Sequence, residues 1–160
     1  MLPQAEELIK LFTERSVTLT TCESPTGGAL GAALTDVPGA SKVYRGGIVA
    51  YDTALKTGLV GVDPELIDAD GVVNELTAIQ MALGTQARCD SDWAVATTGV
   101  AGPTTLDGKD VGTVWFSVVG PKMGMSPRPT YSELQHFEGD RAAVRAAAVE
   151  HAISMILRVV

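Results

Sequence analysis

Cysteine and histidine are scarce in this sequence, with two residues of each among 160. Cys22 and Cys89 form no C-x-x-C pair, and His136 and His151 lie outside the spacings typical of metal ligands. We therefore expect no metal centre and no other cofactor. We also expect the two cysteines to remain reduced.

Long apolar runs and a basic N-terminal segment are also absent. The chain begins Met1-Leu2-Pro3-Gln4-Ala5, without a basic region followed by an apolar stretch. No apolar run approaches the length that spans a bilayer. These absences predict a cytoplasmic protein without a membrane association.

Basic residues are outnumbered by acidic ones, 12 to 19, and the formal net charge is −7. Nucleic-acid binding depends on clustered Lys and Arg that neutralise phosphates, so we expect no nucleic-acid partner. A small phosphorylated ligand stays possible, because a helix N-terminus and one or two cations suffice to hold it.

The apolar residues that are present, 46% of the chain, predict a globular protein with one domain over residues 1–160. Their periodicity predicts five helices, at residues 5–15, 26–34, 64–70, 75–88 and 140–159. It also predicts five strands, at residues 17–22, 44–51, 93–98, 113–119 and 130–137. Strands interleaved with helices favour an α/β fold in which helices cover both faces of a mixed sheet.

Four segments combine polar side chains with glycine or a charge near predicted element ends. In the first, Thr21–Gly28, a strand runs into Ser24 and then into glycines that open a helix. Unpaired N–H groups at such a helix start suit an oxyanion or a phosphate. The alternative is plain helix capping by Ser24 or Thr26.

The second segment, Tyr51–Lys56, lies where the second predicted strand ends. A nucleophilic serine needs a base, and no histidine is near these motifs. A desolvated lysine of lowered pKa is therefore the available candidate. The alternative is that Lys56 is a solvated surface lysine and Tyr51 an ordinary strand-end aromatic residue.

The third segment, Thr97–Pro103, leads a buried strand into a glycine-rich loop. Ligands of open α/β sheets bind at the carboxyl ends of strands, so this loop is placed to line the same crevice as Ser24, although a tight turn would use the same residues. In the fourth segment, Asp140 is a predicted N-cap and Arg141 lies in the first helical turn. Arg141 would bind a phosphate or carboxylate there, or form an ordinary surface pair with an aspartate.

Taken together, these segments resemble the CinA C-terminal-domain family over nearly the whole chain. The family pattern E-S-C-T-G-G corresponds to Glu23–Gly28, and a tyrosine followed five residues later by lysine corresponds to Tyr51 and Lys56. Three further patterns follow in order, S-G-I-A-G-P at Thr98–Pro103, V-G-T-V-W-F at Val111–Phe116 and G-D-R at Gly139–Arg141.

The resemblance implies a three-layer α/β/α sandwich with a mixed central sheet, and hydrolysis of nicotinamide mononucleotide to nicotinate mononucleotide and ammonia. It implies that Ser24 attacks the carboxamide, that Lys56 acts as the base, and that Tyr51 orients or relays. Substrate contacts, including oxyanion donors from one of two backbone segments, are expected from Thr26, Gly27, Gly28, Thr98, Gly99, Ala101, Gly102 and Arg141. Longer family members carry an N-terminal pyrophosphatase-type domain, so we expect this chain to be a stand-alone amidase.

Three positions depart from the family patterns: Pro25 replaces a cysteine, Thr98 a serine, and Asn74 a serine. Asn74 is expected to cap a helix or to contact ligand. Pro25 removes an N–H that an oxyanion could use, and it equally suits a first helical turn. Two alternatives therefore stay open: a weak or inactive nucleotide-binding module of the same fold, and an amidase for another small amide.

The family commonly forms homo-oligomers, so we expect a homodimer. The last predicted helix carries a broad apolar stripe, formed by Ala146, Val149, Ile153, Ile156 and Leu157. This stripe would contribute to the interface, or in the simpler alternative it belongs entirely to the core.

Overall fold

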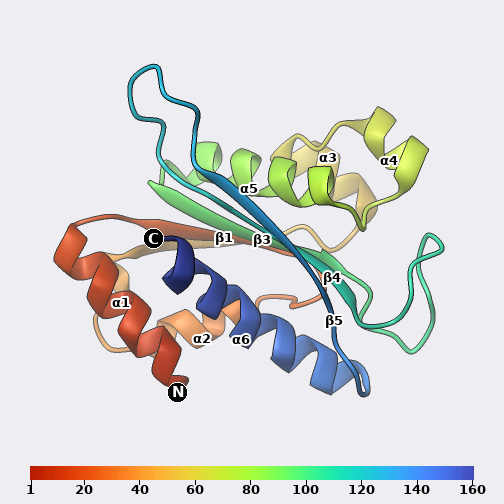
Figure 1. Cartoon of the computed structure of the whole chain (residues 1–160), viewed down its shortest axis with the longest axis horizontal. Helices are drawn as coiled ribbons and strands as arrows, with labels where there is room; N and C mark the ends of the chain where they lie inside the picture. Colours follow the sequence, from red (N-terminus) through yellow and green to blue (C-terminus); the bar gives the residue numbers. More distant parts are fainter.

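Five strands form one mixed sheet in the computed structural model, which describes residues 1–160 (Figure 1). The strands are β1 Leu19–Glu23, β2 Tyr44–Val49, β3 Trp93–Gly99, β4 Thr113–Val119 and β5 Thr130–His136. Their spatial order is β2-β1-β3-β4-β5. β1 is parallel to β2 and β3, whereas β4 is antiparallel to β3 and β5. The predicted mixed sheet is confirmed.

Helices cover both faces of this sheet, which confirms the predicted three-layer α/β/α sandwich. The helices are α1 Pro3–Arg15, α2 Ala29–Thr35, α3 Thr53–Val60, α4 Pro64–Asp70, α5 Glu75–Cys89 and α6 Arg141–Val159. In Figure 1, α1, α2 and α6 lie on one face, and α3, α4 and α5 lie on the other. No helix combines the length and apolar character needed to cross a membrane.

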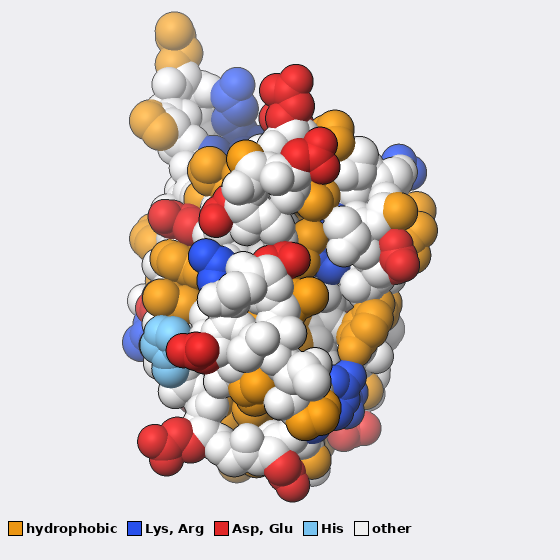
Figure 2. All heavy atoms as spheres, turned by 90° about the vertical axis from the view of Figure 1, so that its right-hand side faces the viewer, with side chains coloured by type: hydrophobic (Ala, Val, Ile, Leu, Met, Phe, Trp, Pro, Cys, Tyr) orange, Lys and Arg blue, Asp and Glu red, His pale blue; other side chains and the backbone are white.

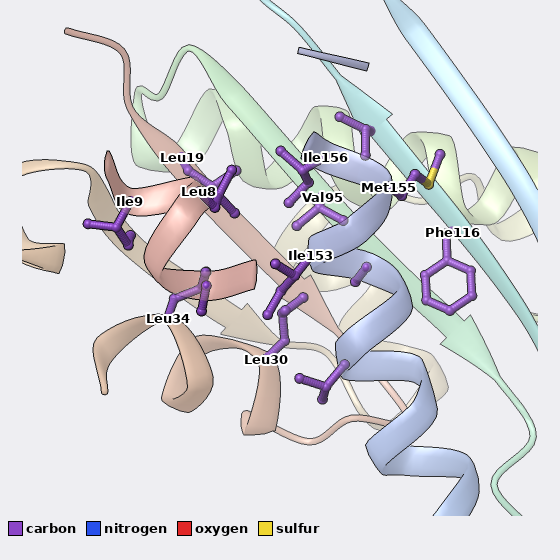
Figure 3. Close-up of a cluster of buried hydrophobic side chains, with 14 of the residues drawn as sticks. Leu8, Ile9, Leu19, Leu30, Leu34, Val95, Phe116, Ile153, Met155 and Ile156 are labelled. Atoms are coloured by element: carbon purple, nitrogen blue, oxygen red, sulfur yellow. The ribbon is translucent and has the colours of Figure 1, made fainter. Parts of the chain in front are cut away.

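The larger core lies between the sheet and the layer of α1, α2 and α6 (Figure 3). Leu8 from α1, Leu30 from α2 and Phe116 from β4 are fully buried in it. The apolar stripe of α6 belongs to the same core, since Val149, Ile153 and Ile156 are all buried. Leu157 is only partly buried and Ala146 is exposed, so the stripe belongs to the core in large part but not entirely. The homodimer stays a prediction.

A second core lies under α5 on the opposite face, where Met81 and Ala82 pack against Ala94 and Ala96 of β3. Cys22 of β1 belongs to this cluster, and burial raises the pKa of its thiol to about 11. Both cysteines are free.

Two helices differ from the sequence prediction. α2 begins at Ala29 rather than Thr26, because Gly27 and Gly28 have positive φ angles of 59° and 99° and cannot continue a right-handed helix. α3 was not predicted as a helix at all. It begins after Asp52, whose side chain accepts a hydrogen bond from the N–H of Ala54 at 2.8 Å.

Candidate active site

The candidate site lies at the carboxyl ends of the three parallel strands, where ligands of open α/β sheets bind. Ser24 follows β1, Tyr51 and Lys56 follow β2, and the loop 99–102 follows β3. These segments line a cavity of about 380 Å³ together with Arg141 and residues 104–106. The structure therefore brings the predicted nucleophile, lysine and glycine-rich loop together in one pocket.

Lys56 is buried rather than solvated, with 1% of its surface exposed. Its Nζ lies 3.0 Å from Ser24 Oγ, 2.8 Å from the carbonyl oxygen of Ala50 and 3.2 Å from that of Tyr51. Burial lowers the pKa of Lys56 because it removes the water that stabilises the ammonium ion, whereas Cys22 and Asp52 act in the opposite direction. The geometry thus places an amine of weakened basicity against the serine hydroxyl.

The turn that carries Ser24 is fixed from within the fold. The N–H of Ser24 donates to the carbonyl of Thr97 at 3.1 Å, which joins the turn to β3. Glu23 is 2% exposed, and its carboxylate accepts hydrogen bonds from the N–H groups of Gly28, Leu30 and Gly31 at 2.9–3.1 Å. A charged acceptor at this helix start is favourable, so Glu23 occupies the position expected for an anionic ligand.

Residues 26–28, which were expected to contact substrate, are engaged within the fold. The N–H of Gly28 is bound to Glu23, and the N–H of Gly27 donates to the carbonyl of Ser24 at 3.1 Å. Thr26 is fully buried, and its hydroxyl lies 3.0 Å from that of Thr97. None of the three residues lines the cavity.

Thr98, also expected to contact substrate, is engaged in the same way. It is fully buried and does not line the cavity, because its hydroxyl donates to the carbonyl of Val72 at 2.6 Å. Its role is to tie β3 to the segment before α5. Asn74 likewise serves as a cap, since its side chain accepts from the N–H of Thr77 at 2.8 Å.

The loop after β3 contributes free backbone donors to the pocket. Its start is anchored by the bond from the N–H of Val100 to the carbonyl of Thr113 at 2.9 Å. The N–H groups of Ala101 and Gly102 donate to no group of the protein, and both residues line the cavity. Two backbone segments were considered as oxyanion donors, residues 26–28 and residues 99–102. Only the second has free N–H groups on residues that line the cavity.

Arg141 of α6 contacts the loop after β3 and the segment after β2 at the mouth of the pocket. Its guanidinium donates to the carbonyl of Gly102 and to the hydroxyl of Tyr51, each at 2.6 Å. Neither an aspartate nor another carboxylate is its partner, so the predicted surface pair is not formed. A guanidinium has five N–H donors, and donors beyond these two contacts remain for a ligand.

None of the residues that form the outer wall of the pocket was predicted from the sequence. They lie in the loop between β3 and β4. Residues 104–106 line the cavity, and the segment beyond them is tied to the end of α4. The Asp107 carboxylate accepts from the N–H of Val72 at 3.2 Å, and Lys109 lies 3.6 Å from Asp70. Asp52 and Thr53 also line the cavity without having been predicted to do so. Nowhere do three or more His, Cys, Asp or Glu side chains gather as metal ligands would.

Comparisons with known proteins agree on one family. The family model of the CinA C-terminal domain matches residues 2–160. A CinA-like protein from Frankia casuarinae is 42% identical over 151 residues, which are 94% of this chain and 34% of that protein. A CinA-like protein from a Synechocystis species is 47% identical over 112 residues, which are 69% of this chain and 27% of that protein. The chain thus spans about a third of the length of the curated relatives it matches.

Solved structures show the same fold. The competence-damaged protein (CinA) superfamily protein of Escherichia coli has a TM-score of 0.91 and 32% identity, covering 98% of this chain and 88% of its own. The competence/damage inducible protein CihA of Agrobacterium tumefaciens has a TM-score of 0.87 and 32% identity, covering 99% of this chain and 97% of its own. The protein therefore belongs to the CinA C-terminal domain family.

Proposed function

We propose that this chain is an amidase that hydrolyses the carboxamide of nicotinamide mononucleotide, with Ser24 as nucleophile and Lys56 as base. The observation that carries the proposal is the 3.0 Å approach of the buried Lys56 amine to Ser24 Oγ inside a cavity. A nucleophile and a base within hydrogen-bond reach are the signature of covalent catalysis by a hydroxyl group. The pyridine nucleotide itself comes from the family resemblance.

The surroundings of Lys56 favour its action as a base. A neutral amine has two hydrogens and one lone pair. The carbonyl oxygens of Ala50 and Tyr51 lie within reach of both hydrogens, at 2.8 and 3.2 Å. The third neighbour is Ser24 Oγ, so the lone pair of the neutral amine faces the serine hydroxyl and accepts its proton.

The reaction then runs through a serine ester. Ser24 Oγ bonds to the carboxamide carbon as its proton passes to Lys56, and the resulting oxyanion is held by the N–H groups of Ala101 and Gly102. Collapse of this intermediate breaks the carbon–nitrogen bond, and Lys56 returns the proton to the departing ammonia. A water molecule then gives a proton to Lys56 and bonds to the ester carbon. The bond between this carbon and Ser24 Oγ breaks, Lys56 returns the proton to Oγ, and the acid product leaves and ionises to the carboxylate. One good oxyanion donor contributes about 2.7–4 kcal/mol in other enzymes.

Two features support a small anionic substrate. A cavity of about 380 Å³ lies within the size range of small-molecule sites. Arg141 supplies the cation at its mouth, and its unused N–H donors suit a phosphate. Pro25 offers no N–H beside the nucleophile, which gives the Ala101 and Gly102 donors the oxyanion role.

The test is release of ammonia from nicotinamide mononucleotide by the purified chain and by Ser24→Ala. We expect turnover by the wild type, its loss in Ser24→Ala, and unchanged turnover in the control Ser41→Ala, an exposed serine outside the cavity. Ser24→Ala activity within about tenfold of wild type contradicts the serine ester. A wild type that binds the nucleotide without turnover supports the inactive module, and ammonia only from other amides supports the alternative substrate.

A further inference from the structure

Arg145 lies one turn after Arg141 on α6 and contacts the turn that carries Ser24. Its Nε donates to the carbonyl of Pro25 at 3.0 Å, and its Nη2 donates to the carbonyl of Thr26 at 3.0 Å. These are the first two carbonyls after the proposed nucleophile. The next residue, Gly27, also lies near the guanidinium, since a Cβ there would be 3.5 Å from Arg145 Nη2.

The contact is a geometric clamp rather than an ion pair. The ion pairs of the protein do not include Arg145, whereas Arg158 further along α6 binds Glu133 at 2.8 Å. A planar guanidinium holds two acceptors in fixed directions, which a lysine ammonium does not reproduce. The two bonds therefore define the orientation of consecutive peptide planes.

Pro25 limits the hydrogen bonds that can hold the backbone beside Ser24. Pro25 has no N–H, so its carbonyl is the one backbone group through which hydrogen bonds can hold it. Glu23 and the N–H of Ser24 fix the turn from the side of the sheet, while Arg145 fixes the segment just past the nucleophile from the side of α6. Without Arg145, the carbonyl of Pro25 would lose its hydrogen bond, although Glu23 would still hold the N–H of Gly28 at the start of α2.

We infer that Arg145 is a positioning residue that sets the direction of Ser24 Oγ toward Lys56. This inference rests on the proposed function only in taking Ser24 as the nucleophile. Displacement of a reacting group by about 1 Å can reduce a rate by as much as 100-fold. Loss of the guanidinium fork should therefore slow bond formation at Ser24 while leaving substrate affinity nearly unchanged.

The experiment measures the rate at which phenylmethanesulfonyl fluoride modifies Ser24, by mass spectrometry, in the wild type, Arg145→Lys and Arg145→Ala. Arg158→Lys serves as the control on the same helix. We expect labelling to be roughly 10- to 100-fold slower in both Arg145 variants and unchanged in the control. Methylguanidinium should restore labelling of Arg145→Ala, and kcat for the amide should fall with KM within about twofold.

The possible results distinguish failure of the positioning role of Arg145 from failure of the proposed amidase function. Wild-type labelling at Ser24 with equally fast labelling of Arg145→Lys overturns the positioning role and leaves the nucleophile in place. Slow labelling that coincides with a lowered unfolding temperature and resists methylguanidinium also overturns it, in favour of a purely structural role. No labelling of Ser24 in the wild type, together with no ammonia release, contradicts the proposed function itself.

Discussion

Lys56 is a buried amine without a carboxylate partner. Its amine is enclosed, and its hydrogen-bond partners are two carbonyls and a hydroxyl rather than a carboxylate. Such surroundings favour the neutral amine, because the ammonium ion gains no full negative charge in exchange for lost water. Asp52 contributes only a weaker opposing effect on the pKa.

The pH dependence of the rate should follow Lys56. Only the neutral amine accepts a proton, so kcat/KM should rise with pH and level off above the lowered pKa of Lys56. Lys56→Arg should be as inactive as Lys56→Ala, since a guanidinium stays protonated throughout. A pH-rate profile of the three proteins checks this. A flat profile, or an active arginine variant, would move the base to another group such as Tyr51.

The same residue predicts a gain in stability from an inactivating change. The unfolded chain keeps the ordinary lysine pKa of 10.5, whereas the folded pKa is lower, so the unfolded state binds more protons between the two values. The contribution of Lys56 to wild-type stability should therefore rise with pH across that interval, whereas the raised pKa of Cys22 acts in the opposite direction above its ordinary value of 9.0. Lys56→Met should stabilise the fold by roughly 0.5–2 kcal/mol at neutral pH, with the gain shrinking toward pH 10.5. Urea unfolding at several pH values measures it, and a less stable variant at neutral pH would show that the amine's hydrogen bonds outweigh its desolvation.

At the scale of elements, the exposure pattern of α3 shows why this helix was not predicted, although Lys56 within it was named as a site residue. Its apolar residues Leu55 and Leu59 are exposed by 41% and 37%, whereas Lys56 points inward and is buried. Because two leucines are exposed and a lysine is buried together with Val60, the helix lacks the usual separation of apolar and polar faces by which amphipathic helices are found in sequences. The strands and the other helices follow the ordinary pattern, so their positions were predicted to within a few residues.

The contact between α3 and α5 gives a prediction with an internal control. Gly84 lies within α5, and a Cβ there would overlap the carbonyl of Val60 at the end of α3. Gly84→Ala should therefore destabilise the fold by about 1–3 kcal/mol despite alanine's better helix propensity. Gly58 is exposed in α3 with open space around it, so Gly58→Ala should stabilise by about 0.5–1 kcal/mol.

Chemical denaturation of the two glycine variants decides between packing and propensity. Opposite signs are expected, because the two changes differ in tertiary contact and not in chemistry. Stabilisation by Gly84→Ala would mean that the helices separate at little cost, which contradicts the close packing of α3 on α5.

At the scale of the whole molecule, the site joins residues that are far apart in the chain. Ser24, Lys56 and the loop 99–102 meet because three parallel strands end together, and α6 then adds Arg141 from near the C-terminus. The motifs with their strand-end positions were visible in the sequence. Three hydrogen-bonded contacts were not visible in the sequence: Thr98 with Val72, Glu23 with the start of α2, and Arg145 with the turn after Ser24. Each depends on which backbone group from another part of the fold lies next to the side chain.

The charge distribution of the molecule leads to the last prediction, which concerns nucleic acid. The net charge is −7, and the face shown in Figure 2 carries isolated Lys and Arg side chains among Asp and Glu, with no continuous basic patch. Nonspecific binding to duplex DNA requires several cations that displace counterions, and its dissociation constants reach about 100 μM at the weak end. The chain should therefore leave the fluorescence anisotropy of a labelled duplex unchanged up to roughly 100 μM protein, even at about 50 mM salt, where such binding is strongest. A rise in anisotropy that declines steeply with added salt would contradict this and would indicate a basic surface on another face.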